Sequence, residues 1–291
     1  MRPTYQQIAD LFALPLSTAS AEPPEPAGPK VQGRTPDESE QLGRTCLTDG
    51  DFEAAIQHFR HAVELRGGES TGDLLIDLAS AYEYGDRAPQ AFRQYLKAVR
   101  AKKDNPEPLV GISDLYKRQG RFRDAIEQLG AALELEPESP FLLFKLAETL
   151  REMGEPTRAL AAALAVVQVK PDDAFYHYWI GDLLISMGHY ADALEALRAS
   201  IELSPGDDFL YVRVAVPFWR TERRTEAVKA IRLASDLDPE KNVYHGLLEA
   251  MLTEMGQIEA ADLESARADQ MDRYDHDVLD RTLGEMGIDL R

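Results

Sequence analysis

The sequence is poor in cysteine, in long apolar runs and in basic residues, and each shortage excludes a class of protein. A single cysteine, Cys46, cannot form an internal disulfide or a cysteine-rich metal site, so nothing indicates an oxidising compartment. No apolar run approaches the roughly 20 residues that a membrane-spanning helix needs. Residues 1–21 carry one arginine and a short apolar patch interrupted by Asp10, which is a poor secretory signal. We therefore expect a cytoplasmic protein with no membrane insertion.

The charge balance narrows the class of partner. The chain has 32 Lys and Arg residues against 51 Asp and Glu residues, which gives a formal net charge of −19. Such a chain repels phosphate backbones and anionic lipid, so we expect no nucleic-acid partner. An apolar or basic protein partner fits better. The alternative that the acids merely solvate the outer faces of helices stays open.

The most informative feature that is present is an alanine that recurs along the chain. The first interval between these alanines is slightly longer than the others, and from the second alanine onward the spacing is constant. A fixed period of about 34 residues is typical of stacked helical hairpins. The alanines are Ala55, Ala91, Ala125, Ala159, Ala193, Ala227 and Ala261.

Other rows recur in the same register and predict how the two helices of a hairpin pack. One row is always large and apolar: Leu42, Leu78, Ile112, Leu146, Ile180, Val214 and Leu248. The position after it is small in six of seven cases, so that a second helix can approach closely: Gly43, Ala79, Ser113, Ala147, Gly181, Ala215 and, as the exception, Glu249. Offsets of three and four residues between rows place them on one helix face.

Glycine and proline rows mark the turns and the ends of the hairpins. The glycines stand where a tight turn between helices needs a residue without Cβ strain: Gly50, Gly120, Gly154, Gly188 and Gly256. The prolines share the constant spacing of the alanines and stand where each second helix ends: Pro137, Pro171, Pro205 and Pro239. The pattern of helix, turn, helix and stop therefore predicts seven repeats over residues 36–275, in the frames 36–69, 72–105, 106–139, 140–173, 174–207, 208–241 and 242–275.

These rows resemble the tetratricopeptide repeat (TPR) family. Frame 174–207 is close to the family pattern, although His177 holds the place of the usual tryptophan; the matching residues are Trp179, Gly181, Gly188, Tyr190, Ala193, Leu197 and Pro205. The resemblance implies an all-α fold, a right-handed α-solenoid of about seven helical hairpins whose first helices line a concave groove. Residues 276–291 are expected to form a C-terminal capping helix, because the last hairpin has no neighbour to cover it.

The segment before the repeats reads as a short helix on a tether. Residues 1–16 begin with a capping-box pattern at Thr4, and an apolar face follows: Tyr5, Ile8, Leu11 and Phe12. Residues 17–35 are rich in proline and predict a flexible linker. A helix this short is not stable alone. Three readings stay open: docking of its apolar face on this chain, docking on another protein, and a disordered leader.

The resemblance also implies which residues line the groove, since the family uses set positions of each first helix. In the fourth to sixth frames these positions hold Phe141, Phe144, Glu148, Phe175, Tyr178, Asp182, Phe209, Val212, Val216 and Trp219. Exposed aromatic side chains are typical anchors of protein interfaces. We therefore expect a partner helix or extended segment with apolar side chains, and a basic side chain of it could pair with Glu148 and Asp182. The alternative is that several of the rings pack between hairpins.

Catalytic and metal-binding readings are weak. His58, His61 and Glu64 share one face of a helix, but this spacing is common on solvated helices. Cys46 lies in a core row and lacks a neighbouring base in the local sequence. We expect no catalytic residue, no metal and no cofactor.

The sequence thus predicts a non-catalytic scaffold or adaptor that holds a partner protein in its groove, such as a subunit or assembly factor of a larger complex. One alternative is a regulatory subunit of an enzyme that acts through its N-terminal helix. Another is a self-associating structural array. The partner and the oligomeric state are not predicted.

Overall fold

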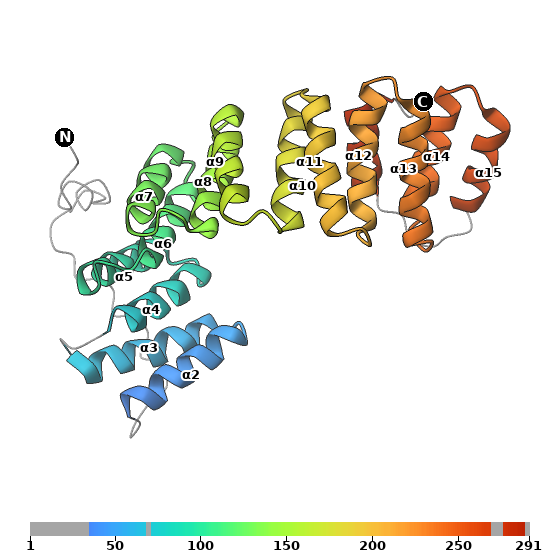
Figure 1. Ribbon diagram of the computed structural model, residues 1–291. Coiled ribbons are helices and arrows are strands. Elements are labelled where there is room, and N and C mark those ends of the chain that lie inside the picture. The colour runs from blue at the N-terminus through green and yellow to red at the C-terminus, as the bar shows by residue number, and fades with distance from the viewer. Residues whose placement is uncertain (1–34, 68–70, 269–275, 289–291) are drawn as a thin grey trace. The chain divides into compact units, whose positions relative to one another are not determined.

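The chain divides into two compact units, residues 1–137 and 138–291, which are described separately. The computed structural model describes residues 35–67, 71–268 and 276–288 (Figure 1). The expected N-terminal helix, with Tyr5, Ile8, Leu11 and Phe12, and residues 17–34 of the expected linker lie outside these residues. The described part of unit 1 contains three hairpins: α2 (Pro36–Thr48) with α3 (Phe52–Arg66), α4 (Gly72–Tyr84) with α5 (Ala88–Ala101), and α6 (Glu107–Arg118) with α7 (Phe122–Leu135).

Unit 2 contains four hairpins and one further helix in its described residues. The hairpins are α8 (Pro140–Glu152) with α9 (Pro156–Val169), α10 (Ala174–Ser186) with α11 (Tyr190–Leu203), α12 (Asp208–Arg220) with α13 (Arg224–Leu237), and α14 (Val243–Glu254) with α15 (Ile258–Ala268); the last helix is α16 (His276–Met286). Each of the seven expected frames contains one hairpin. With fifteen helices and no strand among the described residues, the prediction of an all-α solenoid of repeats is confirmed.

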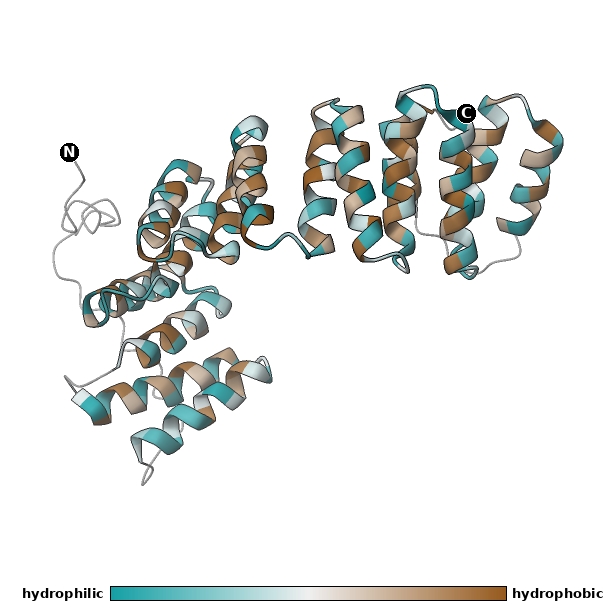
Figure 2. Cartoon of the chain, in the orientation of Figure 1, coloured by the Kyte–Doolittle hydropathy of each residue, from teal (hydrophilic) through white to brown (hydrophobic). Residues whose placement is uncertain are grey.

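The two helices of each hairpin pack on the rows that recur in the sequence. All seven recurring alanines have at most 3% of their surface exposed. The small row allows the first helix to approach the second: a Cβ added at Gly181 would lie 2.6 Å from Leu197 Cγ, and one added at Gly43 would lie 2.7 Å from the Phe59 ring. Figure 2 shows hydrophobic and hydrophilic residues alternating along each helix, as expected when one stripe of a helix is buried.

The turn inside each hairpin depends on one residue with a left-handed backbone. The five turn glycines of the sequence have φ between 71° and 83°. Two hairpins lack a glycine at this place and use Asp86 (φ 57°) and Glu222 (φ 60°) instead. A side chain with a Cβ is strained in this conformation, so these two turns are held by the packing of the hairpins around them.

Two first helices in each unit begin with a capping side chain, and its type differs between the units. In unit 1, the hydroxyls of Thr35 and Thr71 accept hydrogen bonds from the backbone N–H groups of the first turns of α2 and α4. In unit 2, the carboxylates of Asp173 and Asp207 do so for α10 and α12. Either side chain satisfies an N–H group that has no partner within its helix, but only the carboxylate can be titrated.

The last helix does not lie where a simple end cap was expected. α16 packs against α12 and α14, which are both first helices, rather than against the final second helix α15. Its apolar stripe, Leu279, Leu283 and Met286, is at most 3% exposed. What α16 covers is therefore the side of unit 2 on which its first helices lie, and not the outer side of the last hairpin.

Two features are absent from the described residues. No helix there is both long and apolar enough to cross a membrane. The same residues contain no group of three or more His, Cys, Asp or Glu side chains that could hold a metal ion.

Candidate functional site

The candidate site lies on the first helices of unit 2, which neighbour one another. Rings of α8 contact rings of α10, α10 packs on α12, and α16 bridges α12 and α14. We call the surface formed by α8, α10, α12 and α14 the first-helix face. All ten residues predicted to line the groove belong to α8, α10 or α12, three of the helices that form this face.

Five aromatic side chains follow one another across the first-helix face, and we call them the aromatic strip: Phe141, Phe144, Phe175, Tyr178 and Phe209. Ring centroids are 5.2 Å apart for Phe144 and Phe175, 6.3 Å for Phe175 and Tyr178, and 5.8 Å for Tyr178 and Phe209. These are tilted or edge-to-face contacts, the geometry that aromatic pairs prefer. The four rings from Phe144 to Phe209 therefore support one another.

The predicted residues differ strongly in exposure. Phe141 and Phe175 are 55% and 49% exposed. Phe144, Glu148, Tyr178 and Phe209 are half-buried. The other four are buried and cannot meet a partner while the fold is as described: Asp182, Val212, Val216 and Trp219. Of the ten residues predicted to line an open groove, the exposed or half-buried ones therefore lie on α8, at the start of α10 and at the start of α12, and most of the α12 residues are buried.

The reason for this difference is α16. In α8 only a stripe is buried, namely Leu142, Ala147, Thr149 and Leu150. In α12 nearly every residue from Leu210 to Trp219 is buried, and α14 is buried in the same way. A helix that is buried all round has neighbours on every side, and α16 supplies the neighbour on the first-helix face.

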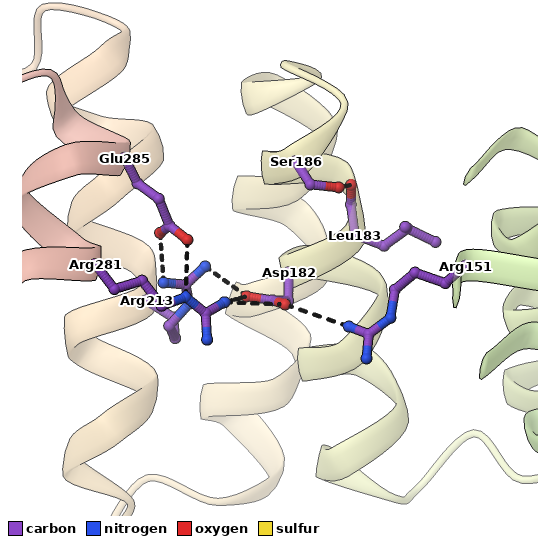
Figure 3. Close-up of polar contacts among 7 residues, drawn as sticks. All are labelled: Arg151, Asp182, Leu183, Ser186, Arg213, Arg281 and Glu285. Atoms are coloured by element: carbon purple, nitrogen blue, oxygen red, sulfur yellow. Dashed lines mark hydrogen bonds and ion pairs between the residues drawn. The ribbon is translucent and has the colours of Figure 1, made fainter. Parts of the chain in front are cut away.

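A set of ion pairs joins α16 to this face, and we call it the arginine–carboxylate network (Figure 3). Asp182 of α10 accepts hydrogen bonds from Arg213 of α12 at 2.5 Å and from Arg281 of α16 at 3.1 Å. Glu285 of α16 pairs with the same two arginines, at 2.6 Å and 3.0 Å. Arg151 of α8 approaches Asp182 to 3.8 Å.

The network corrects one expectation about the partner. Asp182 was expected to receive a basic side chain of the partner, but Arg213 and Arg281 of this chain already occupy its oxygens. Buried ion pairs of this kind are favourable only when each charge is matched. With three arginines and two carboxylates, the network carries one excess positive charge, which favours an acidic rather than a basic group beside it.

The network also reaches the aromatic strip. Burial raises the pKa of the Tyr178 hydroxyl, and the negative charge of Asp182 raises it further. Arg151 lies over the Trp179 ring at 4.9 Å, and Lys145 lies over the Phe141 ring at 5.9 Å. The apolar surface of the strip is therefore bordered by cations at both of these points.

Sequence reasoning missed Tyr176, Arg151, Arg213 and Arg281 as parts of the site. Tyr176 contacts both Phe144 and Phe175, yet the family's groove positions skip it. Arg213 and Asp182 did carry a signal, because each is a lone charge in an otherwise apolar stretch of a first helix. Such charges are rarely buried unless they are paired, and the two could have been assigned to each other.

Comparisons with known proteins agree with this architecture. Two family profiles, both described as tetratricopeptide repeat, match the chain: one over residues 111–151 and 144–208, the other over residues 40–68. No curated protein matches the sequence.

Solved structures of repeat proteins are similar in fold. The C-terminal part of a TPR repeat-containing protein from Cytophaga hutchinsonii has a TM-score of 0.70 at 14% identity, and the match covers 82% of this chain and 98% of that one. YrrB, described as a TPR protein with an unusual peptide-binding site, has a TM-score of 0.51 at 22% identity, over 62% and 92%. MamA from Desulfovibrio magneticus RS-1 has a TM-score of 0.52 at 23% identity, over 61% and 96%. At these identities the likeness shows the fold alone.

Proposed function

We propose that this chain, which belongs to the tetratricopeptide repeat family, is a non-catalytic scaffold that binds a segment of a partner protein on the aromatic strip of unit 2. TPR proteins are protein-interaction modules. YrrB, whose printed description names a peptide-binding site, supports this class of function for the fold.

The observation that carries the proposal is the exposure of Phe141 and Phe175. Both rings stand in the first turn of a helix, and about half of each is in contact with solvent. Neither helix needs a phenylalanine there to form, because a first turn favours small capping or acidic residues. Large rings that the fold leaves uncovered are suited to anchor a partner, and neighbouring rings hold Phe175 in place.

The surroundings of the strip specify the bound segment further. Its rings call for apolar side chains, while the partly exposed guanidinium of Arg151, which only approaches Asp182 to 3.8 Å, can pair with an acidic group. We therefore propose an apolar segment with acidic flanks. Such a scaffold would serve in the cytoplasm as a subunit or assembly factor of a larger complex.

The test combines partner capture with two matched variants. A partner captured from the native lysate by the full chain is identified by mass spectrometry, and its affinity is then measured by calorimetry. Phe175→Ser is expected to weaken the binding at least tenfold, because it removes a half-exposed anchor ring. Leu233→Ser on α13 is the control, since Leu233 is 50% exposed but lies on a second helix. This variant should bind the partner with the same affinity as the unaltered chain.

An equal loss in both variants, or no loss in Phe175→Ser, would contradict the proposal. Both variants are checked by thermal unfolding, so that a fold defect is not read as a binding defect.

A further inference from the structure

The structure already contains one helix bound to the first-helix face, namely α16. It contacts α12 and α14, and through Arg281 it also reaches Asp182 of α10. In the sequence, residues 269–275 separate it from α15. α16 is thus a short helix lying on the same face as the proposed partner site.

The apolar contacts of α16 follow the spacing of an amphipathic helix. Leu279, Leu283 and Met286 stand at positions i, i+4 and i+7, and all three are at most 3% exposed. This spacing forms one stripe of a helix. On α12, which α16 contacts, Val212 and Val216 are completely buried. The face therefore accepts a helix that presents three apolar side chains in this pattern.

The polar contacts of α16 fix its register on the face. Glu285 pairs with Arg213, which is only 2% exposed, and Arg281 pairs with Asp182. Arg281 and Glu285 stand four residues apart on the flank of the apolar stripe, and they also pair with each other at 3.0 Å. A helix that binds here must match one buried arginine and one buried aspartate at the same time.

Two observations indicate that α16 can be exchanged. The hairpins α12–α13 and α14–α15 are complete without it, since each first helix packs on its own second helix. The network is also incompletely satisfied when α16 is bound, because the buried Nε of Arg213 has no hydrogen-bond partner. A helix that offers one more acceptor would satisfy Arg213 better than α16 does.

We propose that the α12–α14 part of the first-helix face is a binding site for an amphipathic α-helix, that α16 occupies it in cis, and that a partner helix replaces α16. The partner helix has apolar residues at i, i+4 and i+7 and an acidic residue at the place of Glu285. This inference rests on the proposed function, because the helix that replaces α16 continues the segment bound on the aromatic strip.

The strip explains how a partner can compete with a helix of the same chain. Such a helix meets its site at an effective concentration of about a millimolar, so a separate helix with the same contacts is at a large disadvantage. A longer partner gains additional contacts on Phe141 and Phe175, which are about half exposed with α16 in place. Those contacts offset the advantage of α16, and α16 excludes helices that lack them.

The experiment uses the full chain and a labelled synthetic peptide of residues 272–291 as the probe. In one variant, Leu283→Asp, the apolar stripe of α16 is broken so that the site is vacated. In a second, Arg281→Ala with Glu285→Ala, the stripe is kept and only the ion pairs are lost. Fluorescence anisotropy gives the affinity of the peptide, and hydrogen exchange of residues 276–286 reports whether α16 is released.

The peptide is expected to bind Leu283→Asp roughly tenfold to a hundredfold more tightly than the unaltered chain, in which tethered α16 competes with it. The affinity of the peptide for the double-alanine variant should lie between its affinities for the unaltered chain and for Leu283→Asp. A control peptide in which the residues at 281 and 285 are exchanged keeps its composition but loses both pairings, and it should bind at least tenfold more weakly.

Equal affinity of the peptide for the unaltered chain and for Leu283→Asp, with α16 released and the repeats folded, would overturn the inference. So would equal binding of the two peptides. The captured partner separates this failure from a failure of the proposed function. If its binding depends on Phe175 but does not strengthen in Leu283→Asp, the scaffold function stands and the replacement of α16 is wrong; if it does not depend on Phe175, the scaffold function itself is wrong.

Discussion

The two units use one scaffold but present different chemistry at equivalent positions. The second residue of each repeat frame is acidic and exposed in unit 1, at Asp37, Asp73 and Glu107. The same position in unit 2 holds Phe141, Phe175 and Phe209 in three successive hairpins, each one full repeat after the last. The acids suit the positive end of a helix dipole, whereas the phenylalanines serve no need of the helix.

This difference separates residues that build hairpins from residues that act on partners. The alanine row, the small row and the turn residues recur through both units because every hairpin must pack in the same way. The phenylalanines occur in three successive hairpins of unit 2 and at none of the equivalent positions of the three hairpins described in unit 1. A feature that departs from the repeat in one unit alone is therefore the better guide to function.

The largest effect on partner binding is expected when one phenylalanine of unit 2 is replaced by an acidic residue, the residue type that unit 1 has at this position. In Phe141→Glu, affinity for the captured partner should fall about a hundredfold, the range of an interface hot spot. The unfolding midpoint should stay the same or rise slightly, since a glutamate there faces the helix dipole and stands four residues before Lys145. Calorimetric titration and thermal unfolding of the same sample measure both effects.

The reciprocal change, Glu107→Phe in α6, is the control and should leave partner binding unchanged. A loss of stability in Phe141→Glu that is as large as the loss of binding would mean that the ring is part of the fold, and the comparison of the two units would fail.

A smaller effect is expected where both units share a packing rule. Gly181→Ala and Gly43→Ala should each destabilise their hairpins by about 1–3 kcal/mol, because the new Cβ overlaps Leu197 or Phe59. Gly130→Ala in α7 should instead stabilise by about 0.5–1 kcal/mol, since a Cβ there meets nothing within 4 Å. Chemical denaturation measures all three, and a neutral Gly181→Ala would show that the close approach is not required.

The smallest expected effect concerns the helix caps and depends on pH. Asp173 caps α10, and the hydrogen bond from Lys170, together with that from the N–H of Phe175, lowers the pKa of its carboxyl. Asp173→Ala should cost about 1 kcal/mol at pH 7. Because the folded-state pKa is depressed, this contribution is complete above the unfolded-state pKa of about 3.9 and is lost as the pH falls through the folded value.

Thr71→Ala in α4 is the matched variant of unit 1, and its cost should not change over the same pH range, since the threonine hydroxyl does not titrate. The free energies of unfolding are compared at neutral pH and at about pH 3, below the unfolded-state value. If the loss of stability in Thr71→Ala depended on pH, or if the loss in Asp173→Ala did not, the caps of the two units would not differ in the way proposed.

Most of the fold could be predicted from the sequence because each hairpin repeats the same local rules. Gly181 with Leu197 and the glycines of the turns are such rules, and each depends on neighbours within one frame. The path of α16 could not be predicted in this way, because it depends on pairings across distant positions, such as Glu285 with Arg213 and Arg281 with Asp182. The pairing of Asp182 with Arg213 and Arg281 was missed with it.

The constant register of the strip has a consequence for how such a protein can change. Each of these hairpins carries its own phenylalanine at the start of its first helix. Duplicating the gene segment that encodes one repeat therefore adds a complete hairpin together with a further phenylalanine in the same register as the others. The length of partner that is held can then grow by whole repeats in a single genetic event, without redesign of the packing between helices.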